Sequence, residues 1–321
     1  MSKKSFTDIV FQDKNYTPFQ KAVAEAVAEN EVSNSSDLAF KLSAAPTTKS
    51  GYSFGGNQLD LGIKINKKGK KVINVHAAAT FLDIMKNAVD QNGNKIVTQS
   101  FLDEIATVND KGVLIGGVIT NIGNARDLTP QQEDIINKEF TSDYGKQKIT
   151  QDYMGEITKR IKKVSKQIDS KIKSPGKPDR YRIKSSEMRA KLKREQYLIL
   201  LVDYDNQFYF SSKGNMMKFL QKSEANSKFS PKDIEKFVLE NTTYGKKEPE
   251  DIKRRYGNAA KALKKFNVQI SGMESDIADE MADIMMDKLK EKQKKCIAPK
   301  KAIPPISFKN HSKTRKSGQG R

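Results

Sequence analysis

The chain has 321 residues, and its composition excludes several classes of protein before any motif is considered. A single cysteine, Cys296, cannot form an internal disulfide, which argues against a disulfide-stapled fold and a cysteine-based zinc site. No apolar run approaches the roughly 18 to 20 residues of a membrane-spanning helix, and the first residues lack the apolar core of a signal peptide. We therefore expect a soluble protein made in the cytoplasm, which reaches a cell wall or periplasm only by a non-classical route.

The formal net charge is +20, and almost all of it lies in two segments. Residues 159–195 carry 15 basic and 4 acidic side chains, and residues 288–321 carry 12 basic and 1 acidic. Such localised charge favours a polyanionic partner, which could be nucleic acid, anionic lipid or the teichoic acids and carboxylates of a bacterial wall. Solvated lysine-rich helix faces would give the same pattern, so both interpretations stay open.

The first predicted helix covers residues 18–31, which are rich in alanine and place apolar side chains one turn apart. It is expected to end near Glu29 to Glu31. The segment from there to Gly62 is dense in Ser, Asn, Pro and Gly and predicts irregular or hairpin structure. Residues 62–74 predict two short strands around Lys68, with a loop as the alternative.

Most of the remaining chain predicts helices. Thr129, Pro130 and Gln132 form a strong start signal that combines an N-cap, a proline at the first helical position and a capping box. The other helices are predicted from apolar spacing or start signals over residues 75–89, 98–110, 154–172, 185–210, 215–221, 230–241, 249–266 and 273–295.

These elements predict a mainly α fold with a small β-hairpin or irregular element. The expected organisation is an N-terminal segment (1–14), a main domain (15–270), an amphipathic helix (271–295) and a disordered basic tail (296–321), with a basic helical insertion at about 155–195. We expect a monomer.

Acidic residues at a helix end, followed by a polar Gly-rich loop with Ser53 and Asp60, suggest acid-catalysed cleavage of a glycosidic bond. Such cleavage needs an acid that protonates the leaving oxygen and a second group that stabilises charge or activates water. An acid near an apolar helix end can stay protonated through desolvation, whereas the second carboxylate suits a polar loop. Glu31 or Glu29 fits the first role, and Asp60 fits the second.

The stretch SGYSFGGNQLDLG at 50–62 resembles the hairpin of the lysozyme-like superfamily, especially phage-type and pesticin-like muramidases. In those enzymes a Glu that closes a helix precedes an SG-x-[TS]-x-G hairpin ending in Asp-Leu-Gly. Residues 128–132 and 203–208 also look like helix segments of such proteins, and Arg254-Arg255 is similar to their double-arginine helix. The resemblance covers about residues 15–265, and its first motif is the most specific.

This resemblance implies a lysozyme-like helical fold with a substrate cleft and cofactor-free cleavage of peptidoglycan between N-acetylmuramic acid and N-acetylglucosamine. Carried onto this chain, Glu31 or Glu29 is the general acid, Ser53 positions water, and Asp60 is the second carboxylate. The residues expected to bind substrate are Asn57, Gln58, Tyr204, Asn206 and Gln207. The polar and aromatic members of 204–207 could instead satisfy buried hydrogen bonds or fill the core.

Two departures from the muramidase pattern leave the reaction type open. Neither Glu29 nor Glu31 is followed by Gly, and the hairpin has Gln58 inserted before the Asp. A Gly-x-x-Gln arrangement is more similar to lytic transglycosylases, which cyclise the muramic acid instead of adding water.

Two other classes of function remain as alternatives. The chain could bind nucleic acid through residues 159–195 and 288–321, or it could be a lysozyme-like effector that binds without cleaving. Nucleotide-binding, zinc-protease and EF-hand motifs do not occur, and His76 is interpreted as structural rather than as a metal ligand.

Overall fold

The computed structural model describes residues 4–12, 15–44, 50–66, 68–90, 92–169 and 181–268. All of them belong to one unit of the chain. The predicted amphipathic helix at 271–295 and the basic tail at 296–321 lie outside the described residues.

The described residues are mainly helical, as the sequence predicts. The α-helices are α1 (Phe6–Val10), α2 (Pro18–Val32), α3 (Ser36–Ala39), α4 (Val75–Asn87), α5 (Gln99–Ile105), α6 (Pro130–Thr141), α7 (Asp143–Ile168), α8 (Ser186–Leu192), α9 (Glu195–Phe208), α10 (Asn215–Lys222), α11 (Pro231–Asn241), α12 (Thr243–Lys247) and α13 (Pro249–Lys265). Short 3-10 turns lie at Val118–Thr120, Gly123–Ala125 and Ser223–Ala225. The strands are β1 (Ser43–Ala44), β2 (Tyr52–Phe54), β3 (Leu59–Asp60), β4 (Lys64–Ile65), β5 (Lys71–Val72), β6 (Thr107–Val108) and β7 (Leu114–Gly116).

Helix α2 starts and ends through local backbone chemistry. The Thr17 hydroxyl accepts a hydrogen bond from the Gln20 amide at 3.2 Å, and Pro18 occupies the first helical position. The helix stops after Val32 because Ser33 and Asn34 both have positive φ, at 51° and 49°. The predicted helix at 18–31 is therefore confirmed.

The β structure consists of three small antiparallel sheets. Strand β2 pairs with both β1 and β3, so the predicted hairpin within residues 50–62 is confirmed. Strands β4 and β5 confirm the two short strands predicted around Lys68. The helix predicted over 98–110 is too long, because α5 ends at Ile105 and the next residues form β6, which pairs with β7.

Helices α6 and α7 follow each other with almost no linker. Thr129 caps α6 with the capping box that the sequence predicts. Helix α7 begins at Asp143, well before the apolar stripe at 154–172 that predicted it, because the Ser142 hydroxyl accepts from the Gly145 amide at 3.0 Å and starts the helix there. Gly155, in the middle of α7, is exposed and has open space where a side chain would stand.

The long helix predicted over 185–210 is wrong, since two helices occupy this segment. Lys193 ends α8, and Arg194 has an extended backbone (φ −67°, ψ 148°) that starts α9 in a new direction. The break lets Leu192 and the apolar run 197–202 both lie in the core.

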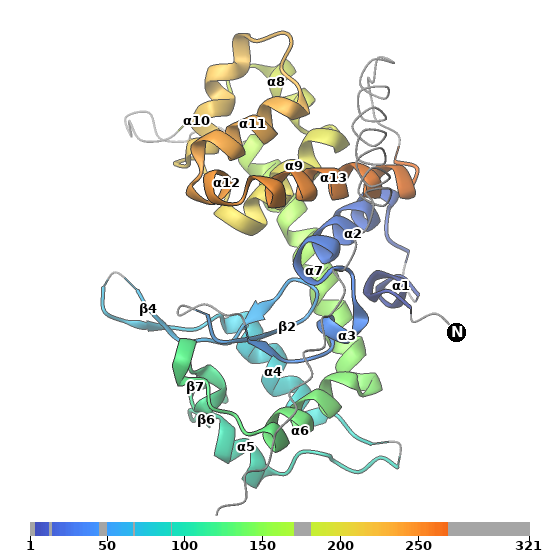
Figure 1. Ribbon diagram of the computed structural model, residues 1–321, viewed down its shortest axis with the longest axis vertical. Helices are drawn as coiled ribbons and strands as arrows, with labels where there is room; N and C mark the ends of the chain where they lie inside the picture. The colour runs from blue at the N-terminus through green and yellow to red at the C-terminus, as the bar shows by residue number, and fades with distance from the viewer. Residues whose placement is uncertain are drawn as a thin grey trace, which may run out of the picture. The chain divides into compact units, whose positions relative to one another are not determined.

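Helix α7 connects the two ends of this unit (Figure 1). It packs against α4 and α6 at the lower end of the view, and against α2 and α9 further up. Helix α13 packs along α2 in the upper part. One continuous cluster of buried apolar side chains joins these helices. No helix among the described residues combines the length and apolarity needed to cross a bilayer.

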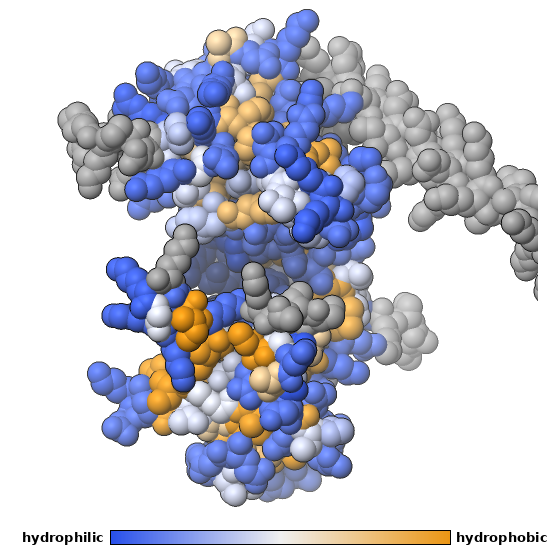
Figure 2. Space-filling view, turned by 60° about the vertical axis from the view of Figure 1, so that its left-hand side comes forward, coloured by the Kyte–Doolittle hydropathy of each residue, from blue (hydrophilic) through white to orange (hydrophobic). Residues whose placement is uncertain are grey.

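Figure 2 shows a hollow across the middle of the molecule, with a hydrophilic floor. In Figure 1 the helices α8–α13 lie above this level, and the strands with α4–α6 lie below it. The surface above the hollow is mostly hydrophilic, whereas apolar surface gathers below it. Exposed apolar side chains of the lower part include Ile65, Val75 and Ile115.

Candidate active site

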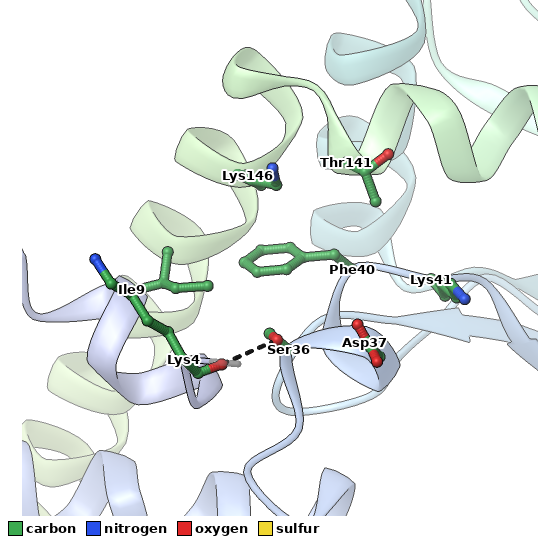
Figure 3. Close-up of a pocket in the computed structure, with 8 residues that line it drawn as sticks. All are labelled: Lys4, Ile9, Ser36, Asp37, Phe40, Lys41, Thr141 and Lys146. Carbon is green, nitrogen blue, oxygen red and sulfur yellow. Dashed lines mark hydrogen bonds between the residues drawn. The ribbon is translucent and has the colours of Figure 1, made fainter. Parts of the chain in front are cut away.

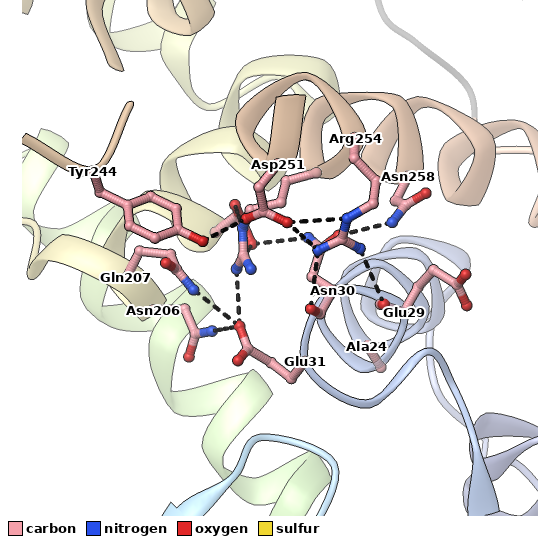
Figure 4. A network of polar contacts seen from close by, with 12 residues as sticks. Ala24, Glu29, Asn30, Glu31, Asn206, Gln207, Tyr244, Asp251, Arg254 and Asn258 are labelled. Carbon is pink, nitrogen blue, oxygen red and sulfur yellow. Dashed lines mark hydrogen bonds and ion pairs between the residues drawn. The ribbon is translucent and has the colours of Figure 1, made fainter. Parts of the chain in front are cut away.

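Glu31 lies in the last turn of α2 and is the centre of a polar network (Figure 4). Its Oε1 accepts hydrogen bonds from Asn206 Nδ2 at 2.9 Å, Gln207 Nε2 at 3.0 Å and Arg255 Nη2 at 2.9 Å. None of the described residues donates a hydrogen bond to its other oxygen, Oε2. The Glu31 side chain is 18% exposed, so one carboxylate oxygen is fixed by protein donors while the side chain still reaches solvent.

Arg255 is the buried cation of this network. Its guanidinium donates from Nε and Nη2 to the two oxygens of Asp203, at 3.0 and 2.8 Å, in addition to its contact with Glu31. Burial lowers the pKa of Arg255, but the negative charges of Asp203 and Glu31 outweigh it and raise that pKa above its usual value. A forked guanidinium suits this arrangement because it satisfies two carboxylates with fixed geometry.

Two further contacts tie the end of α2 to α13. Arg254 donates to the backbone carbonyls of Glu29 and Asn30 at 3.4 and 3.3 Å, where a helix leaves carbonyls without internal partners. Asn258 donates to Asn30 Oδ1 at 2.8 Å, and Asn30 in turn donates to Asp203 at 3.1 Å. These contacts set the position of the backbone that carries Glu31.

Glu29, the alternative acid, is placed differently. Its side chain points away from the network in Figure 4, and no described residue forms a hydrogen bond or ion pair with its carboxylate. Only its backbone carbonyl takes part, through Arg254. The geometry therefore separates the two glutamates that the sequence leaves equivalent.

The hairpin residues Ser53 and Asp60 are directly opposite each other in the β2–β3 register. Their side chains thus share one face of the hairpin. Asp60 Oδ1 accepts from the backbone amides of Gly51 and Gly62 at 3.1 and 2.7 Å, and Oδ2 forms an ion pair with Lys64 at 2.7 Å. No hydrogen bond or ion pair among the described residues joins Ser53 or Asp60 to Glu31.

The two hairpin amides predicted to bind substrate differ in their contacts. Gln58 has a positive φ of 52°, accepts from the Ser43 hydroxyl at 2.8 Å and donates to the Gly55 carbonyl at 3.4 Å. The Asn57 side-chain oxygen is buried and has no hydrogen-bond partner among the described residues.

The predicted substrate-binding residues of α9 divide into two groups. In Figure 4 the side-chain amides of Asn206 and Gln207 both point toward Glu31 and donate hydrogen bonds to it. Hydrogen bonding within the protein is one of the two alternatives that the sequence leaves open for these residues. Tyr204 is buried among Phe208 and Phe210, and burial raises the pKa of its hydroxyl. Asp203 and Arg255 belong to the site but were not predicted as site residues. Asp203 follows the apolar run 197–202, and a charge in a buried helix needs a partner.

His76 lies at the start of α4, beside two carboxylates of α7. Its Nε2 is 3.9 Å from both Asp152 and Glu156, too far for a hydrogen bond. Asp152 also accepts a hydrogen bond from Thr80. Across the part of the chain that the structure describes, no group of His, Cys, Asp and Glu is arranged to hold a metal ion.

A separate open pocket of about 280 Å³ lies between α1, α3 and the junction of α6 and α7 (Figure 3). Phe40 and Ile9 supply its apolar wall, and three lysines stand around it. It is lined by Lys4, Ile9, Ser36, Asp37, Phe40, Lys41, Thr141 and Lys146. None of the residues in the Glu31 network contributes to it.

Comparison with known proteins gives no match for this chain, whether to a family model, a curated protein or a solved structure.

Proposed function

We propose that this protein is a lysozyme-like glycosidase that cleaves the glycan strands of bacterial peptidoglycan, with Glu31 as its general acid. The observation that carries the proposal is the asymmetry of the Glu31 carboxylate. Three side chains from two other helices hold Oε1, and no residue that the structure describes donates to Oε2. A carboxyl held in this way keeps one orientation and has one oxygen available. Because it is ionised beside Arg255, it must take up a proton on Oε2 before it can deliver one to a leaving oxygen.

The second catalytic role is assigned to the hairpin. Ser53 and Asp60 share a face, which suits a hydroxyl that positions water next to a carboxylate. The two backbone amides on Asp60 Oδ1 support its orientation, while Lys64 occupies the other oxygen. A glycan bound in the hollow of Figure 2 would lie between helices α8–α13 on one side and the strands with α4–α6 on the other.

The proposal is tested by incubating the purified protein with purified peptidoglycan and measuring released fragments. We expect the wild-type chain to release fragments and Glu31→Gln to lower the rate by at least about 100-fold, since general acid catalysis contributes about that much or more. Glu29→Gln is the matched control, because this glutamate lies two residues earlier and its carboxylate bonds to no described residue; its rate should equal that of the wild type.

Thermal unfolding of Glu31→Gln must show that the variant is folded. Reducing ends in the products would indicate addition of water, and anhydro-muramic ends would indicate a lytic transglycosylase. A Glu31→Gln variant with wild-type activity, or a folded wild-type protein that releases nothing, would contradict the proposal.

A second candidate function is binding to a polyanion such as nucleic acid. It is favoured by the uneven distribution of charge, since residues 181–268 carry 20 basic and 11 acidic side chains whereas residues 1–158 carry 18 and 19. Retardation of DNA or RNA at low salt that disappears steeply with added salt would support this function. Absence of retardation at low salt would exclude it.

A further inference from the structure

Tyr209 is an unusual residue at the end of α9. It directly follows Phe208, has φ 63° and ψ 96°, and is 67% exposed. Helices commonly end with Gly or Asn in the left-handed region, and a bulky side chain there strains the backbone. Such strain persists only where the surrounding structure imposes it.

The surrounding structure does impose this conformation. Asp205, whose side chain is fully buried, accepts from the Phe210 amide at 2.8 Å and from Lys163 Nζ at 2.7 Å. Phe210 is itself completely buried. The chain is thus fixed on both sides of Tyr209, and the tyrosine ring is directed outward.

The ring is also held on one face. Lys163 Nζ lies 4.1 Å from the ring centroid, which is cation–π geometry, and its ion pair with Asp205 fixes the lysine. Arg160 lies 3.6 Å from the other oxygen of Asp205, so two cations share one carboxylate. The result is a fixed, largely exposed aromatic surface beside two cations.

This ring follows closely in the chain on a residue of the Glu31 network. Gln207 donates to Glu31, and the Cα atoms of Gln207 and Tyr209 can be no more than about 7.6 Å apart. Tyr209 therefore belongs to the same end of α9 that holds the carboxylate of the proposed reaction.

We infer that Tyr209 is a stacking platform for a sugar ring of the bound glycan, with Lys163 and Arg160 attracting carboxylates carried by the strand. This inference rests on the proposed function and names a binding residue for its substrate. Aromatic faces bind the apolar face of a sugar, and a rigid ring loses little conformational freedom when it does so.

The test measures binding separately from cleavage. A soluble tetrasaccharide of alternating N-acetylglucosamine and N-acetylmuramic acid is titrated calorimetrically into Glu31→Gln, which cannot consume it. In this background we expect Tyr209→Phe to bind within about threefold of the parent, and Tyr209→Ala and Tyr209→Gly to bind about tenfold more weakly. Tyr209→Gly also relieves the positive φ, so its melting temperature should not fall and lost folding cannot explain lost affinity.

Tyr181→Ala is the matched control, because Tyr181 also has a lysine over its ring, Lys218 at 5.6 Å. Its affinity should equal that of the parent. The chain contains no Trp, so Tyr209→Trp gives one indole whose emission should change saturably with the tetrasaccharide, whereas Tyr181→Trp should not respond.

The outcomes separate the two claims. Unchanged affinity in Tyr209→Ala and Tyr209→Gly, or no binding by the parent, would overturn the role of Tyr209. Weakened binding in both variants supports it even if the wild-type chain cleaves nothing, a result that would refute only the catalytic proposal.

Discussion

The two acidic groups of the candidate site are held in different ways. Asp60 is positioned by backbone amides from Gly51 and Gly62 and by Lys64, all within nine residues of it. Glu31 is positioned by side chains that are 175 to 224 residues away in the chain. The orientation of Asp60 is a property of its hairpin, whereas that of Glu31 exists only when α2, α9 and α13 are packed together.

The two ion pairs differ in the same sense. Lys64 is 54% exposed, so water screens its charge from Asp60, whereas the Arg255 side chain is 3% exposed. Loss of a buried cation leaves its carboxylate partners without compensation. Changes at the long-range network should therefore affect the whole fold, and changes at the hairpin should stay local.

Replacement of Arg255 should have the largest effect. We expect Arg255→Ala to lower the free energy of unfolding by about 3–5 kcal/mol, because Asp203 keeps its charge in a buried site and Glu31 loses its ion pair. Arg255→Lys should lose less, since it keeps the charge but not the fork. Urea unfolding measures both losses. A loss below about 1 kcal/mol for Arg255→Ala would contradict the claim that the buried network stabilises the whole fold.

Glu139 differs from both Asp60 and Glu31, because it is a buried carboxyl whose oxygens have no hydrogen-bond partner among the described residues. It is fully buried in α6, and burial raises its pKa to about 7. A carboxyl with a raised pKa in the folded state favours folding at low pH, and this contribution is lost as the pH rises from about 4.5 through 7.

Glu139→Gln should therefore gain up to about 3 kcal/mol at pH 8, at about 1.36 kcal/mol per pKa unit, and nothing at pH 4. Urea unfolding at the two pH values measures the difference. An equal gain for Glu139→Gln at pH 4 and pH 8 would contradict this account.

Alanine substitutions at two glycines of α7 compare the effect of a steric clash with the effect of helix propensity. A Cβ at Gly145 would collide with the Glu139 carbonyl, so Gly145→Ala should destabilise the fold by roughly 1–3 kcal/mol. A Cβ at Gly155 meets open space, so Gly155→Ala should stabilise it by about 0.5–1 kcal/mol. Thermal unfolding of the pair gives the comparison, and shifts of the same sign would disprove it.

The smallest effect is expected at Lys64. Lys64→Ala should change the free energy of unfolding by less than about 0.5 kcal/mol, because the pair with Asp60 is solvent-exposed and the two backbone amides remain. Urea unfolding at low and high salt checks this. A loss as large as that of Arg255→Ala would show that the hairpin is not a local unit.

The same contrast explains what the sequence could predict. The capping box at Thr129 and the hairpin at 50–62 depend on residues close together in the chain, and each was predicted. The capping box at Thr17 is equally local but was not predicted. The break between α8 and α9 was missed because 185–210 contains no Gly or Pro, and packing of the apolar run sets the turn at Arg194.

The candidate site likewise depends on contacts between residues that are far apart in the chain. Glu29 and Glu31 are equivalent in sequence because nothing local distinguishes two acids at a helix end. Their difference comes from Arg255 and from the amides of α9, which reach Glu31 only through tertiary packing. No spacing rule within α2 contains that information.

Helix α7 has a consequence for how this unit unfolds. It packs on α4 and α6 in one part and on α9 in the other, and its buried residues belong to one apolar cluster. Neither part can melt without exposing one half of this shared helix. Unfolding of the two parts is therefore coupled, and tryptophans introduced one in each part should report a single transition with the same midpoint.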